Sequence, residues 1–167
     1  PMRLQPEPQR LFTSAGLLNL FHMHNMDDAV ELNGVIFIAA DGFMNRYDTV
    51  QSRWLEPTFI GDKVNQLSTD GTYIYIAGDD SGAHKMHSNG TLLQTWVISD
   101  GLESDSVDSI AVNSNYLIAL NSGSISVIDL SGVASVATFE VDGQGVSDVT
   151  IYGDIAYIAT ENIGLAR

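Results

Sequence analysis

The stretch "VDSIAVNSNYLIALNSG", residues 107–123, sets out the plan of the whole chain. The stretch begins with an apolar residue, two polar residues and a second apolar residue. It continues with a polar turn, then an apolar run that contains Ile-Ala, and it ends with a glycine. The same phrase returns as "MDDAVELNGVIFIAADG" from Met26, "VNQLSTDGTYIYIAGDDSG" from Val64 and "VSDVTIYGDIAYIATENIG" from Val146. The chain is therefore a tandem repeat, and such a repeat decides the architecture.

The repeat is long enough for four short strands. Its anchor alanines, Ala39, Ala77, Ala119 and Ala159, are 38, 42 and 40 residues apart. In the third repeat the strands are expected at 108–113, 116–121, 124–130 and 135–141, with Ser, Asn and Gly turns between them. β-Branched and aromatic residues dominate, and no segment shows a helical period. The sequence predicts an all-β fold made of β-propeller blades, four antiparallel strands each, with about four repeats.

The blades are predicted at 26–63, 64–106, 107–145 and, in part, 146–167. The segment 1–25 is a candidate for a missing outer strand, because "RLFTSAGLLNL" is similar to the repeat end "TWVISDGLES". Either this segment closes a small ring, or the chain is part of a larger propeller. A β-sandwich is the alternative fold, but a sandwich does not require a repeated phrase.

The second strand of each repeat is apolar on both faces, as in "VIFIAA" (35–40) and "YIYIAG" (73–78). A strand tolerates this pattern only where both faces of its sheet are covered. Each sheet is therefore expected to stack between neighbouring sheets, and uncovered end sheets would favour association of copies through their open edges.

The composition excludes several classes of partner and site. The chain has no cysteine, so it has no disulfide and no thiolate ligand. Its 21 acidic and 7 basic residues give a net charge of -14, which argues against binding nucleic acid or anionic membranes. The longest apolar run is shorter than the roughly 20 residues that a membrane helix needs. This acidity fits an extracellular or cell-surface protein.

Residues 100–129, "DGLESDSVDSIAVNSNYLIALNSGSISVID", resemble the repeats of two-component-regulator-type β-propellers, as does "TENIGLAR" at 160–167. "GDIAYIATENIGL" is equally similar to the LVIVD type of propeller repeat. The chain departs from the first type where a Trp is usual in the second strand, and has Phe37, Tyr75, Leu117 and Tyr157 there. The first resemblance implies an extracellular ligand-sensing domain.

Acidic residues gather in the loops expected at one face, namely the connections between blades and the loops that join second and third strands. Such a face suits cations, hydroxyl-rich ligands or a basic protein surface, with Ca²⁺ as the one candidate cofactor. Aspartate is also a common turn former, which is the alternative explanation. The eleven residues are Asp27, Asp28, Asp41, Asp62, Asp79, Asp80, Asp100, Glu103, Asp105, Asp142 and Glu161.

Polar pairs at the start of each innermost strand would surround the mouth of a central channel. They are candidates for binding, and capping of backbone groups at the strand starts is the equally weighted alternative. The predicted ligand-binding residues, from these pairs and the acidic loops, are Asp28, Gln66, Asp79, Asp80, Asp108 and Asp148.

Two histidine pairs, His22 with His24 and His84 with His87, lack a recognisable metal-ligand spacing, so no metal site is predicted. No nucleophile motif or phosphate-binding loop occurs, and no catalytic residue is assigned. Three interpretations stay open: a non-enzymatic binding propeller for a small molecule, carbohydrate or protein, a channel-mouth lyase or hydrolase, and a structural fragment that assembles through its edges.

Overall fold

The fold is all-β, as predicted, with four antiparallel sheets of three or four strands. The computed structural model describes residues 26–61, 63–121, 123–131, 136–140, 145–161 and 164–166. The proposed outer strand from residues 1–25 lies outside this part of the chain. The first sheet contains β1 (Met26–Leu32), β2 (Val35–Ala40), β3 (Phe43–Asp48) and β4 (Arg53–Phe59). The second contains β5 (Val64–Thr69), β6 (Tyr73–Gly78), β7 (Ala83–His87) and β8 (Leu92–Trp96).

The second half of the chain repeats this plan. The third sheet contains β9 (Ser109–Val112), β10 (Tyr116–Asn121), β11 (Ser124–Asp129) and β12 (Val136–Glu140). The fourth contains β13 (Val146–Tyr152), β14 (Ile155–Thr160) and the short β15 (Gly164–Ala166). A single 3-10 turn, Ile98–Asp100, lies in the connection from the second sheet to the third. No helix in the described ranges is long and apolar enough to cross a membrane.

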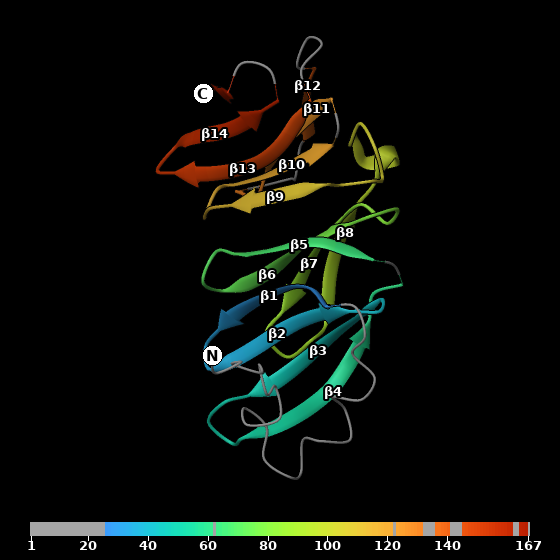
Figure 1. The fold of residues 1–167 in the computed structure, drawn as a ribbon, viewed down its shortest axis with the longest axis vertical. Coiled ribbons are helices and arrows are strands. Elements are labelled where there is room, and N and C mark those ends of the chain that lie inside the picture. Colours follow the sequence, from blue (N-terminus) through green and yellow to red (C-terminus); the bar gives the residue numbers. More distant parts are fainter. Residues whose placement is uncertain are drawn as a thin grey trace, which may run out of the picture.

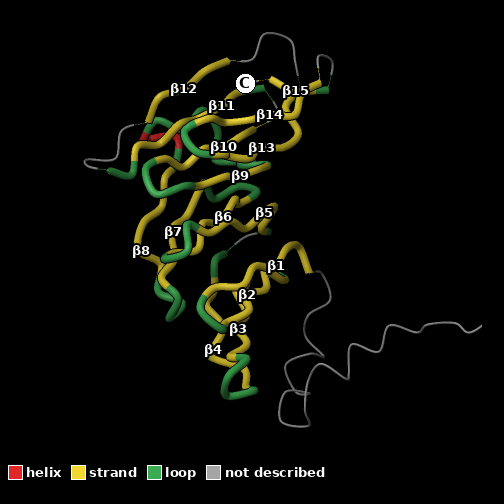
Figure 2. Tube along the Cα trace, turned by 90° about the vertical axis from the view of Figure 1, so that its left-hand side faces the viewer, coloured by secondary structure: helices red, strands yellow, loops and turns green. Residues whose placement is uncertain are grey.

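The sheets are stacked along the long axis of the molecule in chain order (Figure 1). Within each sheet the strands are paired in the order of the sequence. The first strands of the sheets, β1, β5, β9 and β13, lie side by side, while β4, β8 and β12 lie at the other side of the stack (Figure 2). This is the arrangement of neighbouring propeller blades.

Tight turns keep each sheet an uninterrupted meander. The β1–β2 turn is Asn33-Gly34, and both residues have positive φ angles, 52° and 80°. Asn-Gly suits a two-residue hairpin because both residues adopt left-handed φ at little cost, and the turn then matches the strand twist. The sequence therefore specifies the pairing of Leu32 with Val35, and through it the register of the hairpin.

Side chains from adjacent sheets form three separate cores. In β6, Ile74 and Ile76 join the core shared with the first sheet, whereas Tyr75 and Ala77 join the core shared with the third. All four side chains are fully buried. The third core lies between β9–β10 and β13–β14 and includes Ala111, Ile118, Leu120, Val149 and Ile158. Strands β6 and β10 of the two middle sheets are thus covered on both sides, as the sequence predicts, whereas in the described residues β2 and β14 join a core on one side only.

A buried arginine of the first sheet packs against the β7–β8 turn of the second sheet. Arg46 in β3 is 7% exposed, and its guanidinium donates to the carbonyl oxygen of Glu56 at 2.7 Å. A β-carbon on Gly90, in the β7–β8 turn, would lie 2.4 Å from Arg46 Cζ, so only glycine fits there. The hydroxyl of Thr58 donates to the Gly90 carbonyl at 2.7 Å, which fixes the same turn against β4.

Candidate functional site

The acidic face of the molecule is formed by the β2–β3, β6–β7, β10–β11 and β14–β15 loops and by the connections between sheets. These segments share one end of the stack because the sheets are meanders and their first strands lie side by side. Of the eleven predicted acids, Asp62 and Asp142 lie outside the described residues, while the other nine are placed in these loops or at the start of β1. Lys63 is the sole Lys or Arg in these loops within the described ranges.

Asp28 and Gln66 link one sheet to the next. Asp28 Oδ2 accepts a hydrogen bond from the Leu67 amide at 2.8 Å, and Gln66 Oε1 accepts one from the Ile110 amide at 2.6 Å. These amides belong to the innermost strands, whose inner edges have no strand beside them to accept the bond. Each side chain therefore caps the edge of the following sheet, which satisfies a polar group that would otherwise be costly to bury.

Ser109 and Asp148 continue this chain of contacts to the fourth sheet. The Ser109 hydroxyl is buried and lies 2.7 Å from Gln66 Oε1 and 2.9 Å from Asp148 Oδ1. A hydroxyl carries one hydrogen, so Ser109 donates to one of the two acceptors at a time. Asp148 Oδ1 also accepts from the Val149 amide at 2.8 Å.

A repeated irregularity precedes Asp28, Gln66 and Asp148, each of which contacts a neighbouring sheet. The pairing register shifts between Met26 and Asp28, and shifts at the same place in β5 and β13, before Gln66 and Asp148. A bulge of this kind adds one residue to one strand and changes the direction of the neighbouring side chains. In these three repeats the polar pair supplies the extra residue.

Asp79 and Asp108 lie at the junction of the second and third sheets. Asn65 Nδ2 donates to Asp79 Oδ1 at 3.1 Å and to the Val107 carbonyl at 2.9 Å, and Lys63 Nζ donates to Asn65 Oδ1 at 3.0 Å. Partial burial and the negative charge of Asp79 raise the pKa of Asp108 above its ordinary value, while Lys63 acts to lower it. Asp80 follows Asp79 in the same loop and is exposed.

The structure therefore divides the six binding candidates into two groups. Asp28, Gln66 and Asp148 hydrogen-bond within and between the innermost strands, whereas Asp79, Asp80 and Asp108 lie in or beside the acidic loops. Across the described ranges, no group of three or more His, Cys, Asp or Glu side chains is arranged to hold a metal ion. His22 and His24 lie outside these ranges.

His84 takes part in a hydrogen-bonded relay that the sequence pattern does not indicate. Its Nε2 lies 2.9 Å from Ser81 Oγ, and its Nδ1 lies 2.9 Å from Thr95 Oγ1. The imidazole is 4% exposed, and this burial lowers its pKa, so the ring is neutral at neutral pH. In nucleophilic catalysis a Ser hydroxyl is the nucleophile and a neighbouring neutral imidazole is the base that activates it.

The surroundings of Ser81 favour a structural role for the relay. The nearby Gly78 and Gly82 amides donate to the carbonyls of Gly82 and Asp105, so neither is aimed at a reacting oxygen. An acyl-transfer site needs such donors where negative charge develops. The relay fixes the β6–β7 loop to β7 and β8.

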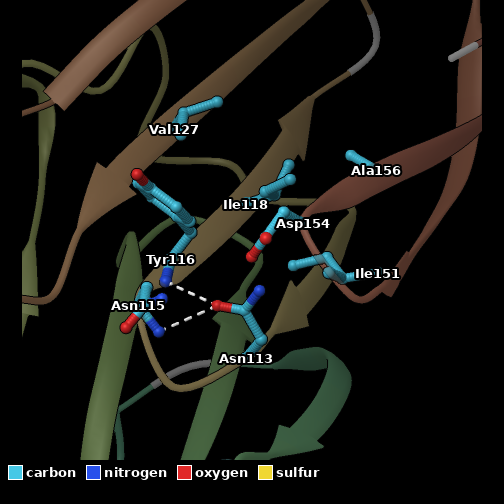
Figure 3. Close-up of a pocket in the computed structure, with 8 residues that line it drawn as sticks. All are labelled: Asn113, Asn115, Tyr116, Ile118, Val127, Ile151, Asp154 and Ala156. Carbon is cyan, nitrogen blue, oxygen red and sulfur yellow. Dashed lines mark hydrogen bonds between the residues drawn. The ribbon is translucent and has the colours of Figure 1, made fainter.

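A groove lies between the third and fourth sheets at the face opposite the acidic loops. Its volume is about 510 Å³. Ile118, Val127, Ile151 and Ala156 form its apolar walls, and Asn113, Asn115, Tyr116 and Asp154 form its polar rim. Figure 3 shows the Asp154 carboxylate pointing toward the side of the groove that carries Asn113 and Tyr116. The repeat pattern did not predict this hollow, because its rim comes from two turns 38 residues apart in the sequence.

Comparisons with known proteins support the propeller fold and do not assign a repeat type. No family model and no curated protein match the chain. The computationally designed Ika4 protein has a similar structure, with a TM-score of 0.70 and 16% identity over 85% of this chain and 89% of that one. U3-55K matches with a TM-score of 0.70 and 15% identity over 83% of this chain. BamB from Moraxella catarrhalis, a β-propeller, matches with a TM-score of 0.59 and 12% identity over 78% of this chain.

The last two matches cover only part of the larger proteins. The chain spans 46% of the U3-55K structure and 38% of the BamB structure. Identities this low carry the fold and not the function. The similarity to two-component-regulator-type or LVIVD-type repeats stays a prediction, and the four sheets of this chain are β-propeller blades.

Proposed function

We propose that the chain is a non-enzymatic interaction propeller whose acidic loop face binds a basic segment of another protein. The observation that supports this proposal is the charge imbalance of that face. Nine of the predicted acids lie there in the described residues, and Lys63 is the sole Lys or Arg in its described loops. A surface lined by one sign of charge attracts partners of the opposite sign and speeds their association.

The position of the carboxylates favours a basic segment over a single bound metal ion. A Ca²⁺ ion takes six to eight oxygen ligands within about 2.6 Å, which requires carboxylates to converge. The described carboxylates are distributed over several loops and do not converge in this way. Distributed carboxylates suit the distributed charges of several Lys or Arg side chains.

The raised pKa of Asp108 supports the same assignment. Asp79 contributes to this shift by repulsion, which means that the local negative charge is not fully offset by Lys63. A cationic side chain brought to this position would relieve the repulsion and lower the pKa of Asp108 again.

The test measures binding of a flexible decapeptide of alternating Lys and Gly by calorimetry at low and high salt. The double variant Asp79→Asn, Asp80→Asn removes two charges and keeps an acceptor for Asn65. With each exposed pair contributing roughly 0.3–1 kcal/mol, its affinity should fall by about three- to thirty-fold. The control variant Glu31→Gln, Glu56→Gln changes the net charge equally away from this face, keeps an acceptor for the Gly34 amide and should bind like the wild type. Equal loss in both variants would refute the assignment to this face.

A further inference from the structure

We propose that the groove between the third and fourth sheets binds a small organic cation, an ammonium group attached to an apolar body. This site lies at the face opposite the acidic loops, so it is independent of the interaction proposed above. Its volume of about 510 Å³ falls within the roughly 300–1,000 Å³ typical of small-molecule sites. Four apolar residues and four residues with polar groups line the groove, and this mixture suits a ligand with an apolar body and a polar head.

The apolar walls account for the body of the ligand. Ile118 and Val127 come from β10 and β11 of the third sheet, while Ile151 and Ala156 come from β13 and β14 of the fourth. A hydrocarbon body of the ligand would contact these walls and be removed from water.

The charge at the rim selects a cation. Asp154 is exposed, its carboxylate points into the groove (Figure 3), and within the described chain it accepts no hydrogen bond. The sequence has no Lys or Arg from Met86 to Ala166, so no basic side chain of the third or fourth sheet offsets this carboxylate. An anion would be repelled, and one carboxylate is too few ligands for a metal ion.

Tyr116 adds a second attraction for an ammonium group. Its ring is 41% exposed and lines the groove on the side toward which the Asp154 carboxylate points (Figure 3). The face of a tyrosine ring attracts ammonium groups through its negative quadrupole. A carboxylate on one side and an aromatic ring on the other form a recognised environment for alkylammonium ions.

Asn113 connects the two turns that form the polar rim of the groove. Its Oδ1 accepts from the amides of Asn115 and Tyr116 at 2.8 Å each, and its Nδ2 donates to the Gly153 carbonyl at 3.0 Å. The turn that carries Tyr116 is thereby fixed to the turn that carries Asp154. Because these turns are fixed before binding, less conformational entropy is lost when a ligand binds.

The test uses three probes with the same phenylpropyl body: 3-phenylpropylammonium, 3-phenylpropan-1-ol and 3-phenylpropanoate. Each is titrated into the ¹⁵N-labelled chain at neutral pH while amide shifts are recorded. The ammonium should bind most tightly and shift the amides of Asn115, Tyr116 and Asp154, and the carboxylate should not bind. In Asp154→Asn, affinity for the ammonium should fall about two- to fivefold, since one exposed pair contributes roughly 0.3–1 kcal/mol, while affinity for the alcohol stays unchanged.

Two further variants complete the design. Glu140→Gln changes the net charge equally at the far end of β12 and should leave ammonium binding unchanged. Ala156→Phe should block the ammonium and the alcohol by filling the groove. The amide spectra of the unliganded variants report whether each one is folded. Equal affinities for the ammonium and the alcohol, shifts confined to the acidic face, or no shift at the highest soluble concentration of the ammonium would each overturn the proposal.

Discussion

Replacing Gln66 by Met tests whether this side chain holds the second and third sheets together. Gln66 Oε1 accepts from the Ile110 amide at 2.6 Å and lies 2.7 Å from the Ser109 hydroxyl. Met has a similar length and no strong acceptor, so Gln66→Met removes these bonds with little change in volume. The Ile110 amide belongs to a residue that is 2% exposed, so it would be left buried without a partner.

The size of the effect follows from which partners are left unpaired. The Ser109 hydroxyl keeps Asp148 Oδ1 at 2.9 Å as an acceptor, so its own loss is small. The Ile110 amide loses its acceptor, and an unsatisfied buried donor costs about 1–3 kcal/mol. Gln66→Met should therefore lower the free energy of unfolding by about 1–3 kcal/mol.

Urea unfolding monitored by fluorescence measures this change, and hydrogen exchange of the Ile110 amide measures its location. Gln94→Met is the matched control, because Gln94 is an exposed residue of β8 in the same sheet. Its free energy of unfolding should change by less than about 0.5 kcal/mol. If Gln66→Met is as stable as the control and the Ile110 amide exchanges at its wild-type rate, the capping role of Gln66 is wrong.

Two further predictions concern Gly90 and His84. Gly90→Ala should destabilise the chain more than Gly71→Ala, because both residues have positive φ but only Gly90 packs against Arg46; urea midpoints of the two variants measure the difference. Burial lowers the pKa of His84 in the folded chain. Below the ordinary histidine pKa near 6.5, the unfolded chain therefore binds more protons than the folded chain, and the free energy of unfolding should fall. His84→Gln should reduce the loss of stability between about pH 7.5 and 5.5; an unchanged loss would contradict this assignment.

The architecture could be predicted because its causes are local and repeated. Turn residues at fixed offsets mark the strand ends, and runs such as Tyr73–Gly78 are apolar at every position, which requires neighbours on both faces. The recurring Ile-Ala step identifies the second strand of each sheet. Ala77 and Ala119 are buried in the same core, as this pattern implies.

The roles of the polar residues could not be predicted from local pattern. A polar pair at the start of an inner strand fits ligand binding and backbone capping equally well. Only the contact of Gln66 with an amide 44 residues away distinguishes the two. Tyr116 and Asp154 likewise meet at one groove only because consecutive sheets stack, and each is an ordinary turn residue in the sequence.

The central claim is that the second and third sheets each pack between two neighbouring sheets, with alternate residues of one strand facing opposite sides. A methyl NOE spectrum of the labelled chain tests it most directly at β6. Ile74 and Ile76 should show contacts with methyl groups of the first sheet, such as those of Leu32 and Met44, and Ala77 with those of Leu117 and Ala119. Contacts of Ile76 and Ala77 with the same neighbouring sheet, or of neither with any other sheet, would contradict the stacked arrangement.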